Sequence, residues 1–152
     1  MEEELKVKKI RNGTVIDHIQ KGKALIVLKI LGVDHRSLQT TVSVAMNVPS
    51  EKMGSKDIVK VEGRELAEDE VNKIALISSE ATINIIRDYK VVEKRKVALP
   101  PTIEAFLKCP NPDCITNDPE PIKTKFFVET TAPVRLRCYY CERLFEGIEE
   151  YI

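Results

Sequence analysis

Four cysteines near the carboxyl end of the chain have the spacing of a metal site. They occur as Cys109-x4-Cys114 and Cys138-x2-Cys141, with 23 residues between the two pairs. Two close thiolate pairs on separate loops can converge into the tetrahedral set of sulfur ligands that zinc accepts. Two disulfides or an iron–sulfur centre are the alternatives that this spacing leaves open. We expect one structural zinc ion per chain, because four protein ligands leave no position for water or substrate.

The sequence shows no secretory signal and no membrane-spanning segment. Met1 is followed at once by three glutamates, where a signal peptide has a long apolar core. The longest purely apolar run covers residues 24–28, whereas a membrane helix needs about 20 apolar residues. We therefore expect a cytoplasmic protein without a membrane partner. In that compartment paired cysteines bind metal more often than they form disulfides.

The remaining residues give little indication of catalysis. The two histidines, His18 and His35, lie outside any recognisable nucleophile or zinc-hydrolase motif. The glycine-rich motifs that cradle phosphates are absent, so side chains such as Lys and His would have to hold a nucleotide. We interpret His35 as a solvated loop residue, and His18 as either a ligand contact or a charge partner of Asp17. The chain is not expected to be an enzyme.

The elements that position these residues fall into two parts. The tandem prolines Pro100 and Pro101 can neither continue a helix nor occupy a central strand. They predict a junction between a domain of residues 1–99 and a domain of residues 100–152. The second part is too small to bury much apolar surface, so it should need its metal to fold.

The first part is predicted to contain strands and helices in the order β-α-β-β-α-β, with one further strand. Strands are expected around residues 13–19, 42–46, 58–61, 82–86 and 91–97, and helices at residues 22–31 and 65–77. The apolar face of the first helix is expected to consist of Ala24, Leu25, Leu28 and Leu31. The fold class is therefore α+β: a ferredoxin-like domain followed by a small all-β zinc domain of the rubredoxin-like ribbon type.

The distribution of charge bears on the class of ligand. The formal net charge of the whole chain is zero. Six basic and nine acidic residues follow Thr102, whereas the first 102 residues carry 18 basic and 15 acidic residues. Nucleic-acid affinity rests on positive charge that faces phosphates, so the acidic second part argues against a nucleic-acid partner. A zinc-ribbon nucleic-acid-binding protein is nevertheless the alternative function, and the basic excess of the first part suits an anionic ligand.

Several motifs in a fixed order resemble the regulatory chain of aspartate carbamoyltransferase. They are Gly13-Thr14-Val15-Ile16-Asp17-His18-Ile19, Asn47-Val48-Pro49-Ser50, Ala81-Thr82-Ile83-Asn84, Cys109-Pro110-Asn111 and Cys138-x-Tyr140-Cys141-Glu142. The resemblance covers nearly the whole chain, and the Lys, Ile and Glu usage looks archaeal. It implies a non-catalytic regulatory subunit of pyrimidine biosynthesis that binds CTP and ATP, with UTP as a further candidate. It also implies a homodimer of regulatory chains that allosterically controls the catalytic chain.

The resemblance further implies which residues form the effector pocket. Carried over position by position, they are Ile10, Asp17, His18, Ser50, Lys56, Lys60, Asn84, Ile86, Tyr89, Val91 and Lys94. Lys94 and His18 would face the triphosphate, and Asp17 would accept hydrogen bonds from ribose hydroxyls. Lys60 would donate to the ribose or to a base carbonyl, and main chain near Ile10 would contact the base edge. An arbitrary surface lysine is more often simply solvated, and the matching motifs favour a ligand role above all for Lys60 and Lys94.

In the zinc domain, the resemblance implies that three residues beside metal ligands contact the catalytic chain. These residues are Asn111, Glu142 and Arg143. The sequence departs from the familiar bacterial pattern at Lys8, Lys96, Asp113 and Tyr139. Because lysine lacks the bidentate geometry of arginine, a phosphate contact at Lys96 is expected to be weaker than in those members.

Overall fold

The chain forms two compact units, Met1–Ala98 (unit 1) and Leu99–Ile152 (unit 2). The structure is a computed structural model and describes residues 9–33, 39–119, 122–131, 133–147 and 149. His35 and Lys8 lie outside the described residues. Within these ranges no helix has the length and apolar character needed to cross a membrane.

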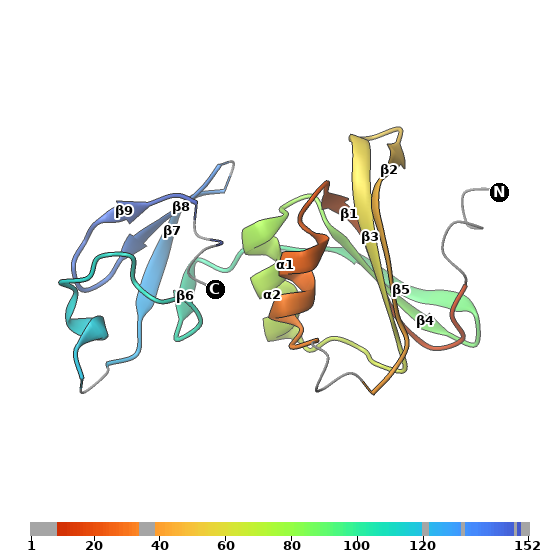
Figure 1. The fold of residues 1–152 in the computed structure, drawn as a ribbon, viewed down its shortest axis with the longest axis horizontal. Coiled ribbons are helices and arrows are strands. Elements are labelled where there is room, and N and C mark those ends of the chain that lie inside the picture. The colour runs from red at the N-terminus through yellow and green to blue at the C-terminus, as the bar shows by residue number, and fades with distance from the viewer. Residues whose placement is uncertain (1–8, 34–38, 120–121, 132, 148, 150–152) are drawn as a thin grey trace. The chain divides into compact units, whose positions relative to one another are not determined.

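Unit 1 is a five-stranded antiparallel sheet with two helices on one of its faces (Figure 1). Its elements are β1 (Gly13–Gln20), α1 (Ala24–Ile30), β2 (Val42–Ser50), β3 (Gly54–Glu62), α2 (Glu68–Ile77), β4 (Thr82–Arg87) and β5 (Lys90–Lys96). The strands lie in the order β2-β3-β1-β4-β5, and every neighbouring pair is antiparallel. The first four strands and both helices have the ferredoxin-like arrangement, and β5 is added at the edge. The predicted fold class is confirmed.

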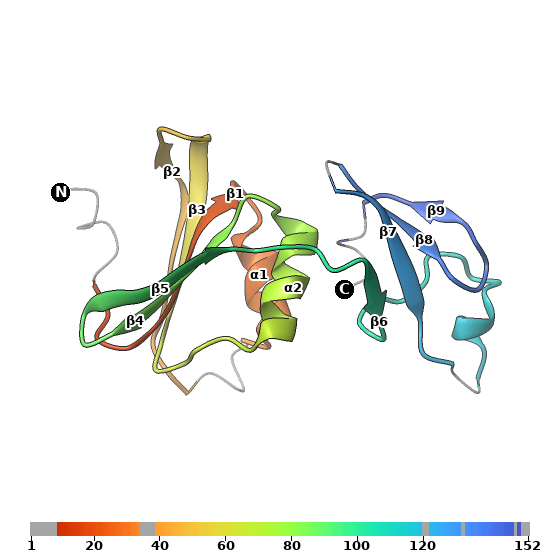
Figure 2. The ribbon, with the colours of Figure 1, turned by 180° about the vertical axis from the view of Figure 1, so that it is seen from behind.

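The core of unit 1 lies between the sheet and the two helices. Ile16, Val59 and Ile83, on three adjacent strands, are fully buried, as are Val27 of α1 and Ile74 of α2. Successive strand residues point to opposite faces, so the residues between these buried positions point away from the helices. We call that second side the open face, because both views show α1 and α2 on the other side of the sheet (Figures 1 and 2).

The apolar face of α1 differs from the predicted one. Ala24, Val27 and Leu31 are buried, whereas Leu25 is 63% exposed and Leu28 is half-buried. The buried positions follow the spacing i, i+3 and i+7. Leu25 lies off this stripe because consecutive helical residues are about 100° apart around the axis. The prediction that Leu25 belongs to the buried face was wrong.

Unit 2 is a four-stranded antiparallel sheet in the order β6-β7-β8-β9. Its elements are β6 (Thr102–Glu104), a short 3-10 helix (Ile115–Asn117), β7 (Lys125–Thr131), β8 (Val134–Cys138) and β9 (Leu144–Phe145). Phe126 and Leu136 are almost completely buried, and the buried Ile103 of β6 is paired directly with Phe126. A core of this size supplies little apolar burial, which makes the cysteine cluster important for stability.

Candidate metal centre and ligand-binding face

The four cysteine sulfurs of unit 2 converge on one point. All four Sγ atoms lie within 4.8 Å of one another. The Sγ atoms of Cys109 and Cys141 are 3.8 Å apart, as are those of Cys114 and Cys138. Sulfurs at about 2.3 Å from a central ion are separated by about 3.8 Å in a regular tetrahedron. All four cysteines are outside disulfides, so the arrangement fits a tetrathiolate metal site and not two disulfide bonds.

A compact loop positions the first two sulfurs. The Cys114 N–H donates to the carbonyl of Asn111 at 3.0 Å, and the Asp113 N–H donates to the Asn111 side chain at 3.1 Å. The Asn117 amide donates to the carbonyls of Cys109 and Asn111, at 3.1 and 2.7 Å. Asn111 is buried, and the hydrogen bonds that it accepts shape this loop. This structural role is separate from the contact with the catalytic chain that the resemblance implies for it.

A tight turn positions the other two sulfurs. The Glu142 N–H donates to the Cys138 carbonyl at 2.9 Å, and the Cys138 N–H donates to the Arg143 carbonyl at 3.0 Å. Glu142 has a φ of 63°, in the left-handed region that closes such turns. The Cys141 N–H points at the Cys138 sulfur, 3.5 Å away. Glu142 and Arg143 are both exposed, so their side chains are accessible at the surface of unit 2.

The protonation of the thiols favours a cation at the centre of the cluster. Burial raises the pKa of Cys109 and of Cys138. Burial also acts to raise the pKa of Cys141, but hydrogen bonds from the Arg143 backbone and the Asn111 side chain lower it to about 7. Buried thiolates without a counter-charge are unfavourable, whereas a bound divalent metal stabilises all four. The donor set thus fits a metal ion.

On unit 1, one row of side chains crosses the open face of the sheet. The register pairs Lys60 of β3 with Val15 of β1, Val15 with Asn84 of β4, and Asn84 with Lys94 of β5. Directly paired residues point to the same side of a sheet and are close neighbours. Three residues predicted for the pocket, 60, 84 and 94, therefore lie in one line across four strands.

The adjacent row lies toward the β4–β5 turn. It pairs Ile86, which is buried, with Val91, which is 56% exposed. Tyr89 has a left-handed backbone in this turn, and its N–H donates to the carbonyl of Arg11 at 2.9 Å. This bond holds the segment that contains Ile10 beside the turn. Ile86, Tyr89 and Val91 thus lie together at the β4–β5 end of the sheet, and Arg11, the chain neighbour of the buried Ile10, is bonded to the same turn.

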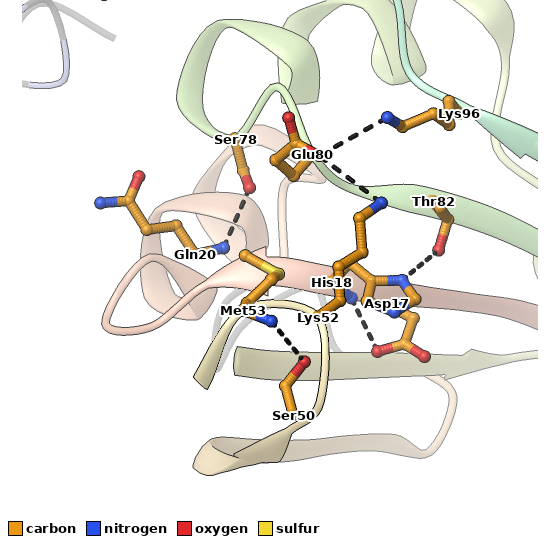
Figure 3. A network of polar contacts seen from close by, with 10 residues as sticks. All are labelled: Asp17, His18, Gln20, Ser50, Lys52, Met53, Ser78, Glu80, Thr82 and Lys96. Atoms are coloured by element: carbon orange, nitrogen blue, oxygen red, sulfur yellow. Dashed lines mark hydrogen bonds and ion pairs between the residues drawn. The ribbon is translucent and has the colours of Figure 1, made fainter. Parts of the chain in front are cut away.

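A β-bulge in β1 places Asp17 and His18 at the other end. His18 has a φ of 56°, and the pairing of β1 with β3 shifts register there. The His18 N–H donates to Asp17 Oδ1 at 2.7 Å, and its Nδ1 lies 3.1 Å from the hydroxyl of Thr82 (Figure 3). Lys56 Nζ is 2.9 Å from Asp17 Oδ1. The bulge therefore gathers an acid, an imidazole and a lysine in one cluster.

This cluster lies in a positive environment. Burial lowers the pKa of His18, and the charges of Lys56, Lys52 and Lys94 lower it further, against the opposing effect of Asp17. Burial likewise lowers the pKa of Lys60, with Asp17 again opposing. Positive groups that converge in this way attract an anion.

Ser50 has a structural role at the margin of this region. Its Oγ accepts a hydrogen bond from the Met53 N–H at 3.1 Å and so shapes the β2–β3 turn. Lys52 of the same turn was not predicted as a site residue, yet its Nζ lies 3.6 Å from Glu80 Oε1. The Nζ atom of Lys96, in β5, lies 3.5 Å from the same Glu80 oxygen. The sequence contains no spacing signal for this trio, because only strand pairing brings residues 52, 80 and 96 together.

The fold and the sites define a two-unit protein: a ferredoxin-like unit with a cationic open face, and a small metal-binding unit built on four cysteines. Two family models match the chain. The model for the aspartate carbamoyltransferase regulatory chain, allosteric domain, matches residues 5–98, and the model for its metal binding domain matches residues 101–150. The chain belongs to the aspartate carbamoyltransferase regulatory chain family.

Relatives match over nearly the whole length of the chain. The chain is 61% identical to the aspartate carbamoyltransferase regulatory chain of Methanothrix thermoacetophila, across 100% of this chain and 99% of the relative. It is 59% identical to the chain of the same name from Pyrococcus horikoshii (96% and 95% covered) and 56% identical to that of Archaeoglobus fulgidus (98% and 98%). Family membership confirms the resemblance and favours a regulatory, non-catalytic chain over the zinc-ribbon nucleic-acid-binding alternative.

Proposed function

We propose that this chain binds a nucleoside triphosphate on the open face of unit 1 and thereby regulates a separate aspartate carbamoyltransferase catalytic chain in pyrimidine biosynthesis. CTP and ATP are the proposed effectors, with UTP as a further candidate. The observation that carries the proposal is the row Lys60, Val15, Asn84 and Lys94 across four adjacent strands. A row of this kind offers cationic and amide groups to one extended anionic ligand.

The groups on the open face suit the parts of a nucleotide. Lys94 and His18 would pair with the phosphates through charge-assisted hydrogen bonds. Asp17 is held by Lys56 and would accept from ribose hydroxyls. The Asn84 amide donates to the Val15 carbonyl at 3.3 Å, which restrains its side chain in the row that would face the ligand. The base would be recognised by main-chain and apolar groups near Ile86, at the β4–β5 end of the open face.

Calorimetric titration of CTP and ATP onto the full chain tests this assignment. Lys94→Gln and Lys60→Gln should each weaken the affinity about tenfold or more, because each removes a charge from the ligand row. Lys73→Gln is the matched control, since Lys73 lies on α2 and pairs with Asp69 at 3.8 Å. Equal losses in all three variants would mean that the open face has no special role.

His18 provides a second, spectroscopic test. In the ligand-free chain its imidazole should titrate below the usual value of 6.5, for the reasons of burial and positive charge given above. A triphosphate carries nearly four negative charges and should raise the pKa of His18 by stabilising the protonated ring. NMR of the two histidine side chains measures this, with His35 as a second reporter. A His18 pKa that stays constant at saturating CTP would place the phosphates elsewhere.

We further propose that the metal is zinc, with one structural ion per chain held by Cys109, Cys114, Cys138 and Cys141. Four thiolates at tetrahedral spacing support a closed site, and zinc accepts such a set without redox chemistry. When bound, the ion contributes folding free energy to unit 2. Elemental analysis of the purified chain distinguishes zinc from iron, which accepts the same ligands.

The remaining part of the proposal concerns partners. Residues 1–99 would form the effector domain, and residues 100–152 the zinc domain that contacts the catalytic chain through Asn111, Glu142 and Arg143. Tyr139 and Tyr140 are exposed, and their rings are in edge-to-face contact with centroids 4.9 Å apart. They lie on the turn that carries Glu142 and Arg143, and they support an interface there. A homodimer of regulatory chains is supported by exposed apolar side chains of unit 1, namely Leu25, Val44 and Met46. The coupling between effector and catalytic chain would be about 1–3 kcal/mol, as is typical of allosteric proteins.

A further inference from the structure

Glu80 forms an unusual arrangement on unit 1, because one of its oxygens faces two lysines from distant segments. Its Oε1 lies 3.6 Å from Lys52 Nζ, in the β2–β3 turn, and 3.5 Å from Lys96 Nζ, at the end of β5. Figure 3 shows dashed lines from the Glu80 carboxylate to both ammonium groups. The charges of Lys96 and then of Lys52 hold the pKa of Glu80 below its usual value.

This trio adjoins the proposed effector site. The register pairs Lys96 with Thr82, and Thr82 with Asp17, in the row next to Asn84 and Lys94. Thr82 also contacts His18 at 3.1 Å. Lys52 is close enough to His18 to lower the pKa of the imidazole. Glu80 therefore brings a negative charge to the margin of a site whose other lysines would bind phosphate.

We propose that Glu80 is an internal counter-ion of the effector site, which occupies Lys52 and Lys96 until a polyphosphate displaces it. The inference rests on the proposed function. It adds Lys52 as a phosphate contact, and it makes the phosphate contact expected at Lys96 depend on the departure of Glu80. The three side chains are 50–56% exposed, so a ligand can reach both ammonium groups from solvent. Exposed ion pairs are weak, which allows a polyanion to replace the carboxylate.

In this mechanism Glu80 lowers the affinity for polyphosphates and leaves the binding of the base and ribose unchanged. A ligand with three phosphates can engage both lysines and repel the carboxylate, whereas a nucleoside does neither. Glu80 thus sets how strongly the site depends on the number of phosphates. Because the α2–β4 loop carries Glu80, its release also gives phosphate binding a direct effect on that loop.

The test compares Glu80→Gln with the wild-type full chain in calorimetric titrations of inorganic tripolyphosphate, CTP and cytidine. The variant should bind tripolyphosphate and CTP about three- to tenfold more tightly, because the rival carboxylate charge is removed. Binding of cytidine should not change. Glu93→Gln is the matched control: it removes the same charge from β5, but Glu93 pairs with Ile85, away from the open face.

A second experiment distinguishes displacement of Glu80 from the two lysines from a general effect of removing one negative charge. In a Lys52→Gln/Lys96→Gln chain, adding Glu80→Gln should no longer increase the affinity for tripolyphosphate. A gain that persists in this background, a gain equal to that of Glu93→Gln, or weaker binding by Glu80→Gln would each overturn the inference. The proposed function fails in a different way, through CTP binding that is insensitive to Lys94→Gln.

Discussion

Replacing Cys138 with serine should abolish metal binding and unfold unit 2 while unit 1 stays folded. Cys138 is completely buried at the end of β8, and its sulfur lies 3.8 Å from that of Cys114. Structural zinc sites contribute on the order of 10 kcal/mol of folding free energy, far more than a core as small as that of unit 2 can replace. Elemental analysis together with hydrogen exchange measured along the full chain would detect both effects. The variant should also fail to co-purify with the catalytic chain.

The matched control for this experiment is Thr116→Val. The Thr116 hydroxyl donates to the Cys114 sulfur at 3.2 Å, so the variant removes one hydrogen bond and keeps all four ligands. It should retain the metal and lose only about 1 kcal/mol of stability. If Cys138→Ser retained a full equivalent of metal and the amide protection of β7 and β8, the cluster would not be the element that stabilises unit 2.

Replacing Asp57 with alanine should destabilise unit 1 by about 3–6 kcal/mol. The Asp57 side chain is completely buried in β3 and accepts three backbone hydrogen bonds. They come from the N–H groups of Gly22 (2.9 Å), Ala24 (3.1 Å) and Asn47 (2.8 Å). One carboxylate thus joins the start of α1 to the part of β2 where its pairing with β3 shifts register. Alanine removes the acceptor of all three N–H groups, each of which loses a hydrogen bond to a charged group. The penalty is largest at Ala24, a buried residue whose N–H has no ready access to water.

Urea unfolding followed by a probe in unit 1 measures this loss. Asp57→Asn retains an acceptor oxygen and should be less destabilising than alanine. Asp69→Ala is the control, because Asp69 is an exposed carboxylate on α2 that faces Lys73 at 3.8 Å, and its removal should change stability by less than about 1 kcal/mol. A similar small effect for Asp57→Ala would show that water or a backbone shift satisfies the three N–H groups.

The sequence predicted the order of the elements well, because strand and helix periodicities are local properties. The face of α1 was predicted less well: in a helix of seven residues, Leu25 and Val27 are equally apolar, and only the position of the sheet decides which is buried. The bulge at His18 was not predicted either, since no glycine marks its left-handed backbone.

For the sites, the accuracy of prediction depended on the kind of signal. The cysteine cluster follows from spacing, because metal ligands come in close pairs. The effector residues came from a resemblance to a family, and strand register then placed 60, 84 and 94 in one row. The Lys52–Glu80–Lys96 trio has no local signature, because exposed charged residues are common and their pairing depends on tertiary structure.

The composition of β5 has a consequence beyond ligand binding. Four of its seven residues are basic, and within the described part of the chain it has a strand neighbour on one side only. An edge strand with unpaired backbone N–H and C=O groups can form hydrogen bonds with a strand of another molecule, which is a first step of aggregation. Two β5 strands that approached each other would meet with like charges. The β5 lysines that attract a small polyanion thus also disfavour pairing between the edge strands of two molecules. Replacing them with neutral residues to weaken effector binding should therefore make the protein more prone to aggregate.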